Sequence, residues 1–173
     1  MKKLNDETRL SLALELWRDL MSGTDQADIL SALVSRLNGA RPGILAHIFF
    51  GCREDGAARF TFIGTDAAEA LKVDNRHGET ALGHHLDILD SVILESHRRC
   101  NAACLRGQGD NGGLSILILP TGPDTSGAPG FLGVCAPGAP ASAGGTARAE
   151  YFAPSIGGQT CENGNVKPLR AAS

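Results

Sequence analysis

The first forty residues place apolar side chains at the spacing of amphipathic helices. One stripe runs over residues 5–21 and a second over residues 25–37. Between them Ser22-Gly23-Thr24 ends the first helix and caps the next, and Asn38-Gly39 ends the second. The stripe positions are Leu10, Leu14, Leu16, Trp17, Leu20 and Met21 in the first segment, and Ile29, Leu30, Leu33, Val34 and Leu37 in the second. We therefore predict two helices that each bury one face.

The pattern then changes to that of strands. Residues 44–50, Ile-Leu-Ala-His-Ile-Phe-Phe, place apolar side chains on both alternating faces, which is typical of a strand covered on both faces. Glu54-Asp55-Gly56 is a hairpin turn signal, and a returning strand follows over residues 58–63. A second strand pair is predicted at residues 115–120 and 131–136. We expect both hairpins to join edge to edge in one sheet.

The segment between the two hairpins is predicted to be mostly helical. Asp66 and Glu69 have the spacing of a capping pair for a short helix over residues 67–71. A longer helix is predicted over residues 81–104, with a strand at 91–95 as the alternative because apolar residues also alternate there. The glycine-rich run 106–113 is predicted to be a loop.

The whole pattern predicts the α+β class: an antiparallel β-sheet with helices packed on its faces. We expect one domain over residues 5–136. Residues 137–173 are rich in glycine, proline and alanine, and we expect there a linker and a weak C-terminal helix or tail.

Composition excludes several classes of function. The chain has 173 residues, a formal net charge of -3 and a pI of about 5.9, so we expect no broad electrostatic binding of nucleic acid. No apolar run is long enough for a membrane span, and the polar residues that follow Met1 do not resemble a signal peptide. Five irregularly spaced cysteines suggest reduced thiols. We therefore expect a cytoplasmic protein that does not bind membranes.

Two motifs suggest chemistry and are outweighed by simpler interpretations. Gly107-x-Gly109-x-x-Gly112 spells a dinucleotide fingerprint, but a helix precedes it and a strand follows, which reverses the required order. His97, Cys100 and Cys104 share one face of the predicted helix at metal-ligand spacing, yet they also continue its apolar stripe. The sequence contains no Gly-x-Ser-x-Gly motif, and we assign no catalytic or metal-binding residue.

The second hairpin carries a family resemblance. Gly113–Pro120, a turn, and Gly130–Ala136 are similar to the Ser-x-Leu-x-Val-Pro strand and Ile-Gly-Val-Leu strand of GAF domains. The upstream order of helix, helix and hairpin agrees, so the resemblance covers roughly residues 8–136. The Pro137-Gly138 stretch stands where the family has a long closing helix, and residues 149–163 are at best a weakened version of it.

The resemblance implies a regulatory or sensory domain that transmits signals by small-molecule binding, dimerisation or both. Its ligand pocket would lie between the sheet and residues 66–113, with His84, His85, His97 and Cys100 as the polar candidates. Ligands across the family include cyclic nucleotides, tetrapyrroles, metal centres and small metabolites, so the resemblance leaves the cofactor unknown. We expect a small-molecule ligand and a homodimer formed through the N-terminal helix. The alternatives are a thiol-dependent oxidoreductase of the methionine sulfoxide reductase type, using Cys100, Cys104 and Cys135, and an interaction domain without a ligand.

Overall fold

The protein is described by a computed structural model that covers residues 6–23, 28–71, 84–109, 112–123, 126–138, 148–153, 159–162 and 165–168. Its elements are α1 (Asp6–Ser22), α2 (Ile29–Ala40), the 3-10 helix η1 (Ile44–His47), β1 (Ile48–Glu54), β2 (Ala57–Ile63), α3 (Thr65–Leu71), α4 (His84–Arg99), β3 (Ala102–Gly109), β4 (Gly112–Pro123), β5 (Pro129–Gly138), β6 (Arg148–Phe152), β7 (Gln159–Glu162) and β8 (Asn165–Pro168).

Six antiparallel strands form the main sheet, in the order β2-β1-β5-β4-β3-β6. The two predicted hairpins, β1–β2 and β4–β5, share this sheet because β1 pairs with β5. The first hairpin turns at Asp55 and Gly56, which both have positive φ as a type I′ turn requires. The predicted α+β class and the edge-to-edge joining of the hairpins are therefore confirmed.

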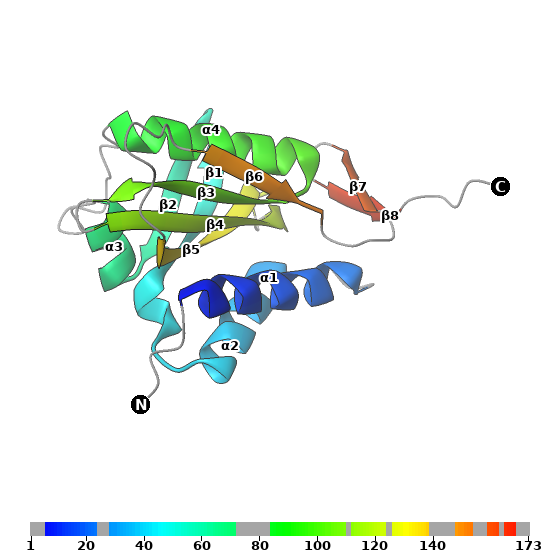
Figure 1. Cartoon of the computed structure of the whole chain (residues 1–173). Helices are drawn as coiled ribbons and strands as arrows, with labels where there is room; N and C mark the ends of the chain where they lie inside the picture. The colour runs from blue at the N-terminus through cyan, green and yellow to red at the C-terminus, as the bar shows by residue number, and fades with distance from the viewer. Residues whose placement is uncertain are drawn as a thin grey trace.

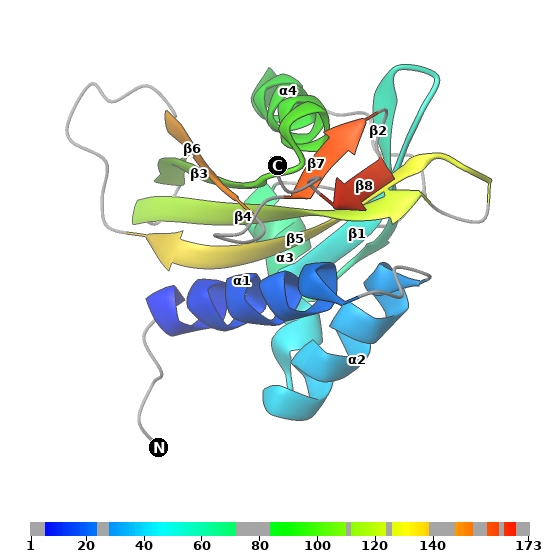
Figure 2. The same ribbon diagram turned by 90° about the vertical axis from the view of Figure 1, so that its right-hand side faces the viewer.

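Helices cover both faces of this sheet (Figure 1). On one face α1 and α2 bury Trp17, Leu33 and Leu37 against Leu117, Leu132 and their neighbours. Trp17 also donates a hydrogen bond from Nε1 to the carbonyl of Pro120, at 2.7 Å. On the other face α3 and α4 bury a second cluster that includes Leu89 and Ile93. Figure 2 shows α4 running above the sheet, with β6 on one side of it and β2 on the other.

The strand predicted over residues 44–50 begins later than expected. Residues 44–47 form η1, and β1 starts at Ile48. Gly43 precedes this turn with a φ of 88°, so the chain leaves α2 through a left-handed position and completes one helical turn before it extends. The apolar run is compatible with a 3-10 helix followed by a strand, because Ile44 in η1 and Ile48 in β1 are both buried.

The helix predicted over residues 81–104 also ends earlier, at Arg99. Cys100 adopts a φ of 50°, and the backbone N–H of Asn101 donates to the carbonyl of Ser96 at 3.2 Å, so the helix is capped there. The next residues form β3, which places Cys104 on a strand and rules out a shared helical face for His97, Cys100 and Cys104. The alternative strand at 91–95 is wrong, because those residues lie within α4.

Strands also replace two other predicted features. The glycine-rich run predicted as a loop forms the facing ends of β3 and β4, where Gly109 pairs with Gly112. The residues predicted to form a weak C-terminal helix contain β6, which pairs with β3 at the edge of the sheet, and the β7–β8 hairpin follows. The sheet therefore takes a strand from beyond residue 136. Within the described ranges, no helix is both long and apolar enough to cross a bilayer.

Candidate functional site

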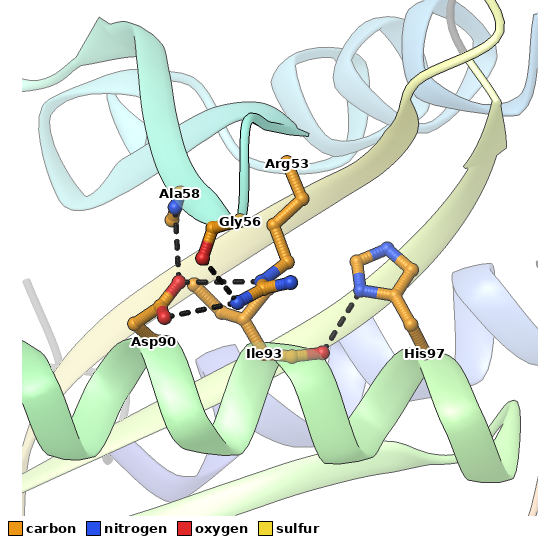
Figure 3. A network of polar contacts seen from close by, with 6 residues as sticks. All are labelled: Arg53, Gly56, Ala58, Asp90, Ile93 and His97. Atoms are coloured by element: carbon orange, nitrogen blue, oxygen red, sulfur yellow. Dashed lines mark hydrogen bonds and ion pairs between the residues drawn. The ribbon is translucent and has the colours of Figure 1, made fainter.

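One flank of α4 is fastened to the β1–β2 hairpin by a charged network (Figure 3). Arg53 of β1 donates to the Asp90 carboxylate from Nε at 3.3 Å and from Nη2 at 3.1 Å, and Nη2 also donates to the carbonyl of Gly56 at 2.7 Å. The backbone N–H of Ala58 donates to the same carboxylate at 2.9 Å. The side chain of Arg53 is 16% exposed and that of Asp90 is 27% exposed, so both charged groups are mostly buried. Their hydrogen bonds therefore hold both side chains in one position.

His97 fastens the same flank of α4 to β5. Its Nδ1 lies 2.8 Å from the carbonyl of Ile93 and its Nε2 lies 2.7 Å from the carbonyl of Gly130. A neutral imidazole has one N–H and donates to only one of these carbonyls, whereas an imidazolium donates to both. Burial nevertheless lowers the pKa of His97. The hydrogen bonds to the two carbonyls raise this pKa in part, and the positive charge of Arg53 lowers it further.

The opposite flank of α4 is open and faces the edge strand β6 across a groove. The groove has a volume of about 460 Å³. Its lining residues are Ile88, Ser91, Val92, Glu95 and Tyr151. The four from α4 follow each other at helical spacing, so they form one face of the helix, and Tyr151 forms the wall on β6. Ile88 is 45% exposed, the highest value among the large apolar side chains described. An apolar surface bordered by polar groups is typical of a small-molecule site.

One end of the groove carries charged side chains. The guanidinium of Arg99 lies 4.3 Å from the centre of the Tyr151 ring, a cation–π contact that links α4 to β6. Arg99 also donates from Nε to Glu95 Oε1 at 2.6 Å, and Arg98 lies 3.7 Å from the other carboxylate oxygen. The hydrogen bond from Arg99 lowers the pKa of Glu95, and the same bond raises the pKa of Arg99. Both groups therefore stay charged near neutral pH.

The space between α4 and the centre of the sheet, where the pocket was predicted, is occupied by side chains. Phe49, Phe60 and Phe131 meet edge to face, with ring centres 5.5–6.3 Å apart. Leu89 and Ile93 pack into the same cluster. The groove lined by described residues lies at the flank of α4, outside this aromatic cluster.

The four predicted ligand-binding residues have different positions. Helix α4 begins at His84, and the side chains of His84 and His85 lie outside the described residues. His97 is buried between two backbone carbonyls on the flank away from the groove. Cys100 is buried and disulfide-bonded, so the expectation of reduced thiols is wrong for this residue. The role of these four residues in ligand binding stays a prediction.

The other two cysteines considered for thiol chemistry are buried free thiols. Cys104 lies on β3 facing the α1 side of the sheet, and Cys135 lies on β5 facing the α4 side. Burial raises the pKa of Cys104, and burial raises the pKa of Cys135 to about 12. Because the thiolate is the reactive form, neither environment activates its sulfur. The described part of the chain contains no group of three or more His, Cys, Asp or Glu placed to hold a metal ion.

Ile88 and Tyr151, which form the two walls of the groove, were not predicted from the sequence. Ile88 lies outside the apolar stripe of α4, on a flank that carries polar residues. Ile88 lies four positions before Val92, so the two side chains are neighbours on the helix surface. This spacing is the sequence signal that indicates a second apolar surface on the helix. Tyr151 had no such signal, because its position depends on β6 joining the sheet edge.

Comparisons with known proteins add little to this geometry. No protein-family model matches the sequence, and no curated protein does. A structure search matches a solved fungal LOV-domain photoreceptor, with 12% sequence identity and a TM-score of 0.40, over 66% of this chain and 94% of that chain. A similarity at this level carries no argument about what this chain binds or does.

Proposed function

We propose that this chain is a regulatory, GAF-like binding domain that takes a small amphipathic molecule into the groove between α4 and β6. The observation that carries the proposal is the groove between a helix and an edge strand whose apolar lining is Ile88, Val92 and Tyr151. A groove of about 460 Å³ falls within the range of small-molecule sites, roughly 300–1,000 Å³.

The asymmetry of α4 suggests how binding is communicated. Asp90 and His97 hold one flank to β1, β2 and β5, so that flank is fixed. The other flank is linked to β6 through the Arg99–Tyr151 contact at the surface. A molecule wedged between Ile88 and Tyr151 contacts both elements at once, and it therefore favours one spacing of α4 and β6 over others.

The dimer expected through the N-terminal helix stays a separate proposal. The predicted stripe is used within the chain, because Trp17 and Met21 are fully buried in the cluster between α1 and the sheet. A homodimer would therefore have to use the outward side of α1. Light scattering of the purified chain measures the molar mass directly, and a single-chain mass at high concentration would contradict the dimer.

An NMR titration with octan-1-ol tests the binding site. We expect amide shifts to change over residues 88–95 of α4 and 149–152 of β6. Ile88→Asp places a charge in the groove and should abolish the shifts. Leu94→Asp is the matched control, because Leu94 is 37% exposed on the same helix but is not among the residues that line the groove. Equal loss of binding in both variants, or shifts confined to other elements, would overturn the proposed site.

A further inference from the structure

We infer that the ligand of this groove is an amphipathic monoanion, such as a small carboxylate with an apolar body. This inference rests on the proposed function, since it names the chemical class of molecule for the same groove. It follows from the charges at one end of the groove together with the apolar surface along the rest.

The described side chains at the charged end carry an excess of one positive charge. Glu95 supplies one negative charge, and Arg98 and Arg99 supply two positive charges. Arg99 is committed to Glu95 and to the Tyr151 ring. Arg98 is 72% exposed, and its contact with Glu95 at 3.7 Å is too long for a hydrogen bond. Its guanidinium is therefore the group best able to donate to an incoming carboxylate, in the two-pronged geometry that arginine favours.

A cationic ligand is less well matched. Among the described residues that line the groove, the acidic one is Glu95, whose Oε1 already accepts the hydrogen bond from Arg99 at 2.6 Å. A ligand ammonium would have to compete with that bond and would face the charges of Arg98 and Arg99. Asp90 does not help, because its carboxylate is held by Arg53 and Ala58 on the other flank of α4.

The apolar part of the ligand would lie along Ile88, Val92 and Tyr151. Ile88 and Val92 are one helical turn apart, and Glu95 follows close to one further turn along. A molecule aligned with the groove therefore meets the apolar residues first and the arginines at its end. This order matches an amphiphile with a single acidic group at one end.

Isothermal titration with two probes of equal chain length tests the charge. At low salt we expect octanoate to bind the full chain about five- to tenfold more tightly than octylammonium, a preference that added salt weakens. Arg98→Gln should reduce the preference to about twofold or less. Arg59→Gln makes the same change in net charge on β2, at the opposite edge of the sheet, and should leave the preference intact.

The possible results separate three claims: the charge of the ligand, the role of Arg98 and the groove itself. Equal binding of both probes, or tighter binding of octylammonium, overturns the anionic ligand while the groove itself stands. A preference that survives Arg98→Gln, or that disappears equally in Arg59→Gln, overturns the assignment of Arg98. If octanoate, octylammonium and octan-1-ol all fail to bind, the proposed function falls and this inference falls with it.

Discussion

The ring of Phe49 lies directly over Gly133 at the junction of the two hairpins. The two residues are paired across β1 and β5, and a Cβ atom placed on Gly133 would lie 2.0 Å from Cζ of Phe49. Phe49 is fully buried among Phe60 and Phe131, so its ring has no free space to move into. The two hairpins can therefore pair at this point only because residue 133 is a glycine, which leaves room for the Phe49 ring.

Substituting Gly133→Ala should lower the free energy of unfolding by about 1–3 kcal/mol, the usual cost of overfilling a core. Urea denaturation followed by circular dichroism measures it. Gly39→Ala is the matched control, because a Cβ at Gly39 meets no atom within 4 Å and the residue lies in α2, where alanine is favoured. Its stability should be unchanged or higher. An equal response of the two variants would contradict the account of this junction.

The sequence was sufficient to predict the two hairpins of this sheet because their signals are local, whereas β3 was predicted as the end of a helix and a loop. The Asp55-Gly56 turn fixes the first hairpin, and the apolar run from Ser115 to Pro120 is buried on both faces, as its composition predicts. Strand β6 was missed for the opposite reason. Polar and apolar residues alternate over only four positions, from Arg148 to Tyr151, and the strand forms because β3 offers an unpaired edge, which is a property of the assembled sheet.

Removing Asp90 should loosen α4 from the first hairpin. Asp90→Ala leaves the Arg53 guanidinium and the Ala58 N–H without this acceptor, so we expect a loss of about 1–3 kcal/mol in the free energy of unfolding. Asp19→Ala breaks the pair of Asp19 with Arg36, in which both side chains are far more exposed, and should cost less than about 1 kcal/mol. Equal costs, measured by chemical denaturation, would show that the Asp90 network does not hold α4.

His97 should make stability depend on pH. Its pKa in the folded chain is lowered from the ordinary value of 6.5, mainly by burial, so between those two values the unfolded chain binds a proton that the folded chain does not. The contribution of His97 is therefore fully present above pH 6.5 and is lost as the pH falls through that window. Denaturation of the wild-type chain and of His97→Gln from pH 5 to 7.5 tests this. The difference between them should change below pH 6.5, and a constant difference would contradict the prediction.

The buried thiols should react slowly while the chain is folded. A pKa of about 12 for Cys135, against an ordinary value of 9.0, reduces its thiolate fraction by about a thousandfold near neutral pH. Labelling with iodoacetamide followed by mass spectrometry should modify Cys104 and Cys135 only after urea is added, whereas the half-buried Cys52 should be modified earlier. Rapid labelling of Cys104 or Cys135 in the native chain would restore the thiol-dependent oxidoreductase as an alternative.

The candidate site was less predictable than the fold, because it depends on how α4 is rotated. Histidine and cysteine were predicted as the polar ligand-binding residues, yet the ring nitrogens of His97 lie against backbone carbonyls that no sequence pattern specifies. The groove is formed by Ile88 and Tyr151, which are 63 positions apart and meet only after β6 pairs with β3. Such a surface follows from the tertiary structure and not from a local motif.

Intermolecular NOEs between octanoate and the methyl groups of Ile88 and Val92 test the groove most directly. In methyl-labelled protein with octanoate near saturation, we expect cross-peaks from the octanoate chain to both residues and to the Tyr151 ring, with the Leu94 methyl groups as the internal control that shows none. Cross-peaks to Leu94 of equal strength, or to the α1 and α2 side of the sheet instead, would contradict the account.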